Sequence, residues 1–331
     1  MPKAIVMEQG VTFMKISVVM IDGGFRENIY AAQSFCQQDF PRDQYEVLWV
    51  EFYSRPHAGL ARLPAVKVHT LQQQGIYHSS YCFNAGIRAA TGEVLVIPDA
   101  DQYVAPDFLF RVWELHNRYD RLVAYGYRLD ELERGVLQSH HLAELRRKCV
   151  LKNPTNYGGC LTVRKTWLEL VNGYEQHPLF QTGNHANGLD MYTRFKNVGL
   201  AVQWEPALEL YHPWHPATLE STREHKAQWK IIEWRRKTLQ WQAFNGLDPG
   251  RNVKPPPEAE MILTEELRLL QAAPPDARSI SSAGHSDSAL GVDPALTAVN
   301  HLLAALGNTP LSAGAGSGPY PSVTGNSTSR R

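Results

Sequence analysis

The sequence predicts an α/β protein built on a doubly wound, mainly parallel sheet. Short, continuously apolar runs rich in β-branched residues alternate with longer segments of helical periodicity, at the spacing of βαβ units. Several of these runs end in acidic residues. Because right-handed crossovers bring the carboxyl ends of parallel strands to one rim of the sheet, we expect those carboxylates to meet there.

The first half of the chain supplies the expected parallel strands. Residues 16–21 (ISVVMI) form the first strand, which ends in Asp22-Gly23-Gly24, and residues 26–38 follow with helical spacing. The other elements expected before residue 120 are strands at 46–52, 66–71 and 94–97 and helices at 79–90 and 106–119.

The second half is predicted with shorter strands and a long final helix. Residues 122–127 resemble an edge strand, and the expected remaining elements are strands at 160–163 and 201–204 and helices at 142–148, 166–171, 189–198 and 221–244. We expect an N-terminal extension at 1–14, one domain at 15–245, a Pro-rich linker with short helices at 246–306, and a disordered tail at 307–331.

Composition limits the classes of function. The 331 residues contain 33 Lys and Arg and 33 Asp and Glu, and this zero net charge argues against a nucleic-acid-binding protein. The four cysteines lack C-x-x-C spacing, so we expect buried thiols, not a zinc site or disulfides. No apolar stretch approaches the roughly 18 residues of a membrane span, and the N-terminus lacks a signal-peptide core. We expect a soluble, cytoplasmic protein, with peripheral contact to the inner face of the membrane left open.

Two carboxylates, Asp99 and Asp101, follow the apolar run at 94–97 and Pro98. They should project from the carboxyl end of a buried strand, where ligands of open α/β sheets bind. Carboxylate oxygens there suit Mg²⁺ or Mn²⁺, and such an ion would neutralise a diphosphate. The alternative is an ordinary strand-ending turn, in which Asp is common.

Several motifs around these carboxylates occur in an order typical of one family. They are NAGI at 84–87 with ATGE at 90–93, PDAD at 98–101, GGCLTVRK at 158–165 with GYE at 173–175, GLDMYTR at 188–194 with Gly199, and HPWHP at 212–216. Over residues 15–216 this order resembles the GT-A glycosyltransferases, specifically the inverting sugar-nucleotide transferases of family 2. The resemblance implies a Rossmann-like GT-A fold and a metal-dependent enzyme that moves a sugar from a nucleotide-diphosphate donor to an acceptor hydroxyl.

The resemblance also implies roles for individual residues. Asp101 would bind Mn²⁺ or Mg²⁺, and Asp99 would contact the ribose or a metal-bound water. His212 would complete the metal site, with His215 or a proline-stiffened surface loop as the alternatives. The implied donor-binding residues are Asp22, Glu51 and Asn84.

The proposed general base is Asp190, because an acceptor hydroxyl must lose its proton as it attacks. The alternative for Asp190 is a helix N-cap. The acceptor is unknown: a saccharide, a lipid-linked molecule or a small molecule would each fit.

The sequence departs from the family pattern at four places, one of which is DGG at 22–24 in place of a Thr-x-Asn-like turn. Leu189 stands where an acidic residue usually precedes the base, and EFYS at 51–54 replaces paired Asp residues followed by Gly-Ser. Phe83 precedes Asn84 where the family often has Arg, so a cation for the diphosphate must come from elsewhere, with Arg88 and Arg164 as candidates. A retaining GT-A transferase, which also uses D-x-D and a late histidine, stays open, and the missing Asp pair leaves open a non-catalytic protein that binds nucleotide sugars.

Two further alternatives follow from the residues themselves. A metal-dependent phosphohydrolase would need more convergent acids than the sequence places near Asp99. The helix at 221–244 carries lysines and arginines beside tryptophans, which suits either a membrane surface or packing on the domain; we favour packing.

Overall fold

The computed structural model describes residues 13–24, 26, 28–132, 142–181, 184–214 and 222–272. Most of the expected N-terminal extension, the second half of the expected linker, the expected tail and His215 lie outside the described residues.

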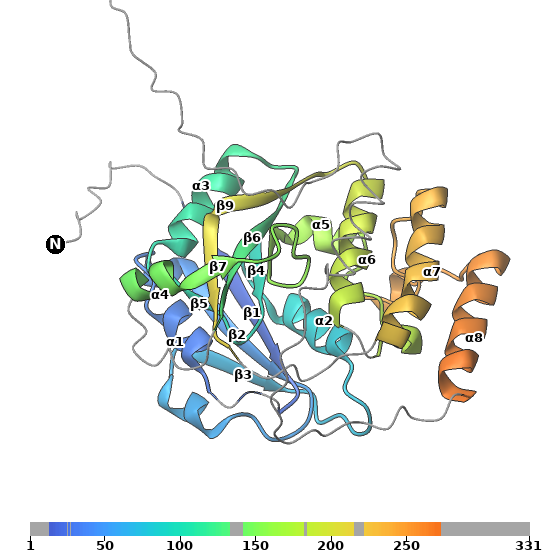
Figure 1. Cartoon of the computed structure of the whole chain (residues 1–331), viewed down its shortest axis with the longest axis horizontal. Coiled ribbons are helices and arrows are strands. Elements are labelled where there is room, and N and C mark those ends of the chain that lie inside the picture. The colour runs from blue at the N-terminus through green and yellow to red at the C-terminus, as the bar shows by residue number, and fades with distance from the viewer. Residues whose placement is uncertain are drawn as a thin grey trace, which may run out of the picture. The chain divides into compact units, whose positions relative to one another are not determined.

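A single mixed sheet organises the described chain (Figure 1). Its strand order is β3-β2-β1-β4-β8-β6-β9-β5, with β7 paired to β6. The strands are β1 Ile16–Asp22, β2 Tyr45–Glu51, β3 Val66–Thr70, β4 Val94–Pro98, β5 Tyr103–Val104, β6 Leu122–Glu131, β7 Cys149–Leu151, β8 Cys160–Arg164 and β9 Ala201–His212. The first four are parallel, and the later strands mix parallel and antiparallel pairs. The expected α/β fold class is confirmed.

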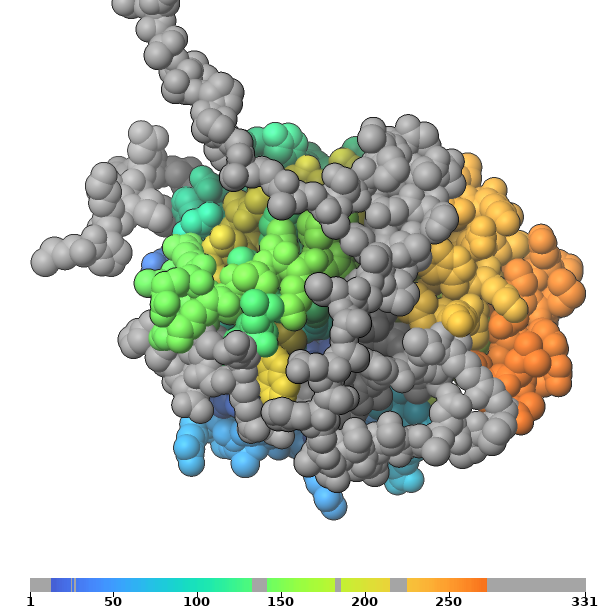
Figure 2. Space-filling view, viewed as in Figure 1, coloured from blue at the N-terminus to red at the C-terminus, as the bar shows by residue number. Residues whose placement is uncertain are grey.

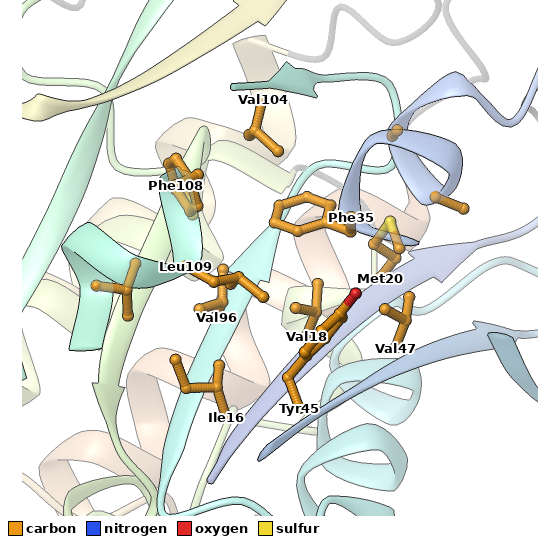
Figure 3. Packing of buried hydrophobic residues seen from close by; sticks show 14 of the residues in the cluster. Ile16, Val18, Met20, Phe35, Tyr45, Val47, Val96, Val104, Phe108 and Leu109 are labelled. Atoms are coloured by element: carbon orange, nitrogen blue, oxygen red, sulfur yellow. The ribbon is translucent and has the colours of Figure 1, made fainter. Parts of the chain in front are cut away.

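Helices cover both faces of this sheet. They are α1 Tyr30–Cys36, α2 Ser79–Ala89, α3 Phe108–Arg118, α4 Leu142–Lys148, α5 Lys165–Leu170, α6 Asn184–Asn197, α7 Thr222–Thr238 and α8 Pro257–Ala272. One apolar cluster joins α1 and α3 to the sheet, with Phe35 and Phe108 in edge-to-face contact at 5.8 Å between ring centres (Figure 3). A second cluster on the other face joins α2, α5 and α6 to the alternate residues of the same strands.

Two of the expected strands differ from those in the structure. The predicted edge strand at 122–127 is wrong: β6 lies inside the sheet, between β8 and β9. Its first residues are buried on both faces, because Ala124 packs in the first cluster and Val123 in the second. Strand β9 is longer than expected, since polar residues such as Gln203 and Glu209 hide the apolar alternation from the sequence.

The helices α7 and α8 pack together beside α6 and form one side of the surface in Figure 2. Trp234 is buried there, and its indole donates a hydrogen bond to Glu258 of α8 at 3.0 Å. Leu247 belongs to the second apolar cluster. Residues 246–272, expected to be part of a linker, therefore pack against the domain. Of the two tryptophans of α7, Trp234 is a core residue and Trp229 packs against the same cluster partly buried. No described helix is both long and apolar enough to cross a membrane.

Candidate functional site

The carboxyl ends of three parallel strands bring acidic side chains together as expected. Asp22 ends β1 and Glu51 ends β2, and the two are direct register partners. Asp99 and Asp101 follow β4, the other neighbour of β1. Asp22 accepts a hydrogen bond from the backbone N–H of Gly23 at 2.8 Å. The polar groups expected at a nucleotide-binding rim are therefore present at the strand ends.

Glu51 is completely buried, and its Oε1 accepts a hydrogen bond from the backbone N–H of Tyr53 at 3.1 Å. Burial, assisted by the nearby charge of Asp22, raises the pKa of Glu51 to about 7. Its second oxygen, Oε2, accepts no hydrogen bond from the described residues. A buried oxygen without a partner marks a position where a ligand group would complete the bonding.

His212, at the end of β9, faces Asp101 across a distance of 3.7 Å between Nε2 and Oδ1. Its other ring nitrogen, Nδ1, lies 3.1 Å from the carboxylate of Asp130, which is its register partner on β6. Burial would lower the pKa of His212, but the attraction of Asp101 and the contact with Asp130 outweigh it and raise the pKa to about 9. A carboxylate that orients one ring nitrogen while the other faces a second ligand is the arrangement of many metal-binding histidines.

The side chains at this position supply part of the ligand shell that the expected divalent metal would need. Asp101 supplies a carboxylate oxygen and His212 an imidazole nitrogen, a pair that suits Mn²⁺ better than Mg²⁺. Among the residues that the structure describes, no group of three or more His, Cys, Asp or Glu side chains is arranged to hold an ion. Any further ligands would therefore have to come from the donor or from water.

Asp99 lines a pocket beside this pair. The pocket is bounded by Ile21, Arg26, Tyr77, Phe83, Ile97, Pro98, Asp99, Tyr157, Gly158, Leu161, Tyr174, Asn187 and Gly188. Burial and the neighbouring Asp101 raise the pKa of Asp99 to about 6. The wall contributed by α6 approaches closely, because a Cβ on Gly188 would lie 2.4 Å from the carbonyl oxygen of Tyr157. Asp99 is the carboxylate among these lining residues.

Arg26 is a site residue that sequence reasoning missed. Its guanidinium forms an ion pair with Oδ2 of Asp101. The sequence assigns Arg26 to the start of a helix, whereas α1 begins only at Tyr30. The two candidate arginines for the diphosphate are bound elsewhere: Arg88 donates to the carbonyl of Leu247 at 2.8 Å, and Arg164 donates to the carbonyl of His116 and to Asp120.

Asn84, expected to bind the donor, has a structural role instead. Its side chain is completely buried, and its amide both donates to the carbonyl and accepts from the N–H of Tyr174, each at 2.8 Å. A Cβ on the neighbouring Gly173 would lie 2.4 Å from Oδ1 of Asn84. The motif that contains Asn84 therefore connects α2 to the turn after α5.

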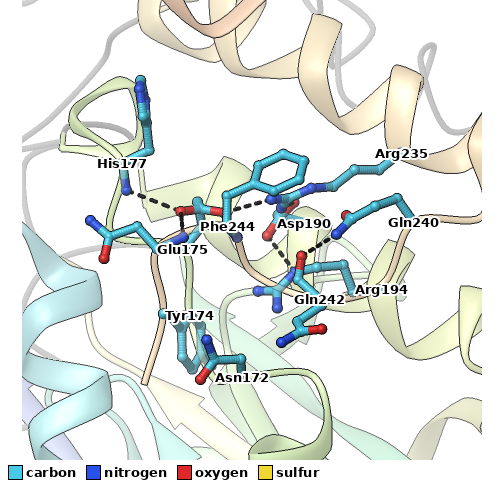
Figure 4. Close-up of polar contacts among 12 residues, drawn as sticks. Asn172, Tyr174, Glu175, His177, Asp190, Arg194, Arg235, Gln240, Gln242 and Phe244 are labelled. Atoms are coloured by element: carbon cyan, nitrogen blue, oxygen red, sulfur yellow. Dashed lines mark hydrogen bonds and ion pairs between the residues drawn. The ribbon is translucent and has the colours of Figure 1, made fainter. Parts of the chain in front are cut away.

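Asp190, expected to be the general base, lies in a buried ion-pair cluster (Figure 4). Its Oδ2 accepts a hydrogen bond from Nε of Arg194 at 2.8 Å, and its Oδ1 is paired with Arg235 of α7. Arg235 also pairs with Glu175 at 2.5 Å. Burial would raise the pKa of Asp190, but Arg194 and Arg235 outweigh it and hold the pKa below its ordinary value.

The geometry around Asp190 disagrees with both roles considered from the sequence. A general base must reach the acceptor, whereas Asp190 is 1% exposed and is not among the pocket-lining residues, which on α6 are Asn187 and Gly188. The N-cap alternative is wrong, because α6 begins at Asn184 and places Asp190 in its interior. We therefore assign Asp190 to the connection between α6 and α7.

Comparison with known proteins finds a family model and solved structures that are similar to this chain. The glycosyl transferase family 2 model matches residues 62–171. No curated protein matches the sequence. Among solved structures, S. aureus TarS 1–349 in complex with UDP is 16% identical, with a TM-score of 0.50, over 87% of this chain and 79% of that one.

Two further solved structures are similar. S. aureus TarS 1–349 in complex with UDP-GlcNAc is 16% identical, with a TM-score of 0.50, over 77% of this chain and 72% of that one. The mannosyltransferase PcManGT from Pyrobaculum calidifontis, in complex with GDP-Man and Mn²⁺, is 18% identical, with a TM-score of 0.47, over 89% and 81% of the two chains. The TarS matches show that the fold is GT-A.

Proposed function

We propose that this chain transfers a sugar from a nucleotide-diphosphate donor to an acceptor hydroxyl in a metal-dependent reaction, which the match of residues 62–171 to the glycosyl transferase family 2 model and the GT-A fold support. The observation that carries the proposal is the row formed by Asp130, His212 and Asp101 at the carboxyl ends of the strands. It offers an oriented imidazole and a carboxylate next to the pocket that contains Asp99.

Asp101 and His212 would hold the metal, and Asp130 would fix the orientation of the imidazole. A divalent cation bound there would stabilise the negative charge that the leaving diphosphate gains. Because Asp101 and Asp130 favour the protonated imidazole of His212, metal binding would be coupled to release of that proton. Mn²⁺ is the preferred ion, with Mg²⁺ as the alternative.

Asp22 and Glu51 would contact the nucleoside. Both end parallel strands at the rim where nucleotides bind in open α/β sheets. The unused Oε2 of Glu51 supports this role, because a ribose hydroxyl or a base N–H would supply the missing donor. Glu51 would accept this hydrogen bond alone, since Phe52 stands where the family has a second acid.

We propose a single displacement that inverts the anomeric centre. The acceptor oxygen would form its bond to the anomeric carbon as the bond to the diphosphate breaks, and its proton would pass to a base. Asp190 enters this proposal as the residue that connects α6 to α7, not as the base, because both of its oxygens are held by arginines.

The test is sugar release from a panel of UDP- and GDP-sugars with Mn²⁺, for the wild-type protein and Asp101→Ala. We expect one donor to be hydrolysed or transferred by the wild type and none by the variant. Product NMR would assign the anomer, and net retention would contradict the single displacement. Binding of nucleotide sugars without sugar release under any metal would instead identify a non-catalytic binding protein.

A further inference from the structure

Among the described residues, few cationic side chains lie near the carboxylates at the ends of the strands. Asp22, Asp99 and Asp101 all lie close enough to Arg26 to attract its charge, and Asp130 bonds the ring of His212. Arg128 is already directed at Asp130, with its Nε 3.0 Å from Oδ1. Arg26 is the guanidinium that bonds Asp101 itself. The charge balance at Asp101 therefore depends on Arg26 and on the ring of His212.

Both oxygens of Asp101 face a positive group. Oδ2 is paired with Arg26, and Oδ1 faces His212 at 3.7 Å. The guanidinium of Arg26 is permanently charged, and it occupies Oδ2 of Asp101, where a divalent ion would also need a carboxylate oxygen. The two cations must compete for the same ligand.

The position of Arg26 permits such an exchange. It lies before α1 begins, so no helix fixes its backbone, and its side chain is 23% exposed. It lines the same pocket as Asp99. Its Nε is buried, and none of the described residues accepts a hydrogen bond from it. The guanidinium thus borders the pocket that contains Asp99, and its Nε can still donate a hydrogen bond to a ligand.

We propose that Arg26 is an internal counter-ion of Asp101, which a divalent cation displaces, and that the displaced guanidinium then binds the diphosphate of the donor. This inference rests on the proposed function, since it assumes that Asp101 is a metal ligand. It assigns the diphosphate contact that Arg88 and Arg164 cannot supply, because both are bonded to other parts of the fold. A guanidinium is well suited to this contact, since its planar fork matches phosphate oxygens.

The test compares Arg26→Gln and Arg26→Lys with Arg111→Gln, a control that breaks an exposed ion pair between Arg111 of α3 and Asp107, the residue before that helix. Mn²⁺ affinity would be measured by electron paramagnetic resonance without nucleotide, and UDP and GDP affinity by calorimetry at saturating Mn²⁺. For Arg26→Gln we expect Mn²⁺ to bind about fivefold more tightly and the nucleotide about tenfold more weakly. Both affinities of Arg26→Lys should lie between those of Arg26→Gln and the wild type. Arg111→Gln should change neither affinity.

Unchanged or weaker Mn²⁺ binding by Arg26→Gln would overturn the competition, and unchanged nucleotide binding would overturn the diphosphate contact. Failure of the proposed function gives a different result, in which Asp101→Asn binds Mn²⁺ as well as the wild type does. If circular dichroism shows that Arg26→Gln is unfolded, Arg26→Lys decides, because lysine keeps the charge but loses the planar fork. Nucleotide affinity equal to that of the wild type would then overturn the diphosphate contact, and unchanged or weaker Mn²⁺ binding would overturn the competition.

Discussion

Two clusters of carboxylates and cations in this domain have similar residues and opposite properties. The Asp101 cluster comprises Asp101, Arg26, His212 and Asp130, and the Asp190 cluster comprises Asp190, Glu175, Arg194 and Arg235. The Asp190 cluster pairs two carboxylates with two guanidiniums, and all four residues are at most 1% exposed. In the Asp101 cluster the side chains of Arg26 and His212 keep 23% and 15% of their surface exposed.

Bonding within the Asp190 cluster is nearly complete. The two oxygens of Glu175 accept from Arg235 and from the backbone N–H groups of His177, Phe244 and Asn245. Arg194 donates to the carbonyls of Val171 and Gly173 as well as to Asp190. A buried cluster so fully bonded cannot accept a substrate without losing bonds of its own.

The difference shows that residue type alone does not identify a reactive carboxylate. The Asp101 cluster lies at strand ends, gathers acids of like charge, and keeps exposed groups that can exchange partners. The Asp190 cluster joins α6, α7 and the turn after α5 with balanced charges. We therefore expect changes in the first cluster to alter chemistry and changes in the second to alter stability.

The largest expected effect is on catalysis by Asp101→Ala. Removing the carboxylate should lower sugar release by about 10³-fold or more, because the charge on the leaving diphosphate would lose its stabilisation. The free energy of unfolding should change little, since the loss of the pairing with Arg26 is offset by relief of the repulsion between Asp101 and Asp99. Steady-state kinetics and thermal unfolding would measure both, and metal-stimulated activity at the wild-type level would rule out the metal-ligand role.

Asp190→Asn should mainly lower stability, whereas Asp101→Ala mainly lowers activity. Neutralising one carboxylate leaves two buried guanidiniums against Glu175, and breaking such a buried pair costs about 3–5 kcal/mol of stability. Urea denaturation would measure the loss, and Glu175→Gln is the matched variant within the same cluster. A fall in kcat of about 10²–10⁴-fold without loss of stability would instead identify Asp190 as a general base.

Deleting α8 should produce a smaller loss of stability. Ala259 and Leu263 of α8 are buried against α7, so a chain that ends at Pro256 would expose this surface, at a cost of about 2–4 kcal/mol. A chain that ends at Asp276 keeps α8 and is the control. Equal stability of the two chains by urea denaturation would show that α8 does not support α7.

The pH dependence of Glu51 gives the smallest expected effect. The pKa of Glu51 is about 7 in the folded protein and 4.5 as an ordinary carboxyl, so between these values the folded state keeps a proton that the unfolded state has lost. Its contribution to stability is therefore present below pH 4.5 and is lost as the pH rises to 7. Glu51→Gln should remove this loss and stabilise the protein by about 1–3 kcal/mol at pH 8. A stability difference from the wild type that does not vary with pH would contradict the raised pKa.

Local patterns predicted the strands of the first half and the meeting of Asp22, Glu51, Asp99 and Asp101. These predictions needed only apolar runs, their ends, and the handedness of crossovers. The pairing of His212 with Asp101 was implied by the resemblance of the HPWHP motif to the family. In the structure the imidazole of His212 faces a carboxylate oxygen of Asp101.

The roles of Asn84, Asp190 and Arg26 could not be predicted, because each is decided by a distant partner. Asn84 bonds the backbone of a residue 90 positions away, Asp190 pairs with an arginine 45 positions away, and Arg26 with an aspartate 75 positions away. A hydrogen bond to a backbone group does not depend on the partner's residue type, so the sequence does not indicate it. An ion pair does require opposite charges, but a chain with 33 acidic and 33 basic residues offers too many possible pairs.

The most direct test of the contrast between the clusters is Mn²⁺ binding to the wild-type protein, Asp101→Asn and Asp190→Asn. Electron paramagnetic resonance would measure it at a temperature at which circular dichroism shows all three folded. We predict that Asp101→Asn binds Mn²⁺ about tenfold more weakly or worse, whereas Asp190→Asn binds it as the wild type does. Wild-type affinity in Asp101→Asn, or loss of affinity in folded Asp190→Asn, would contradict the account.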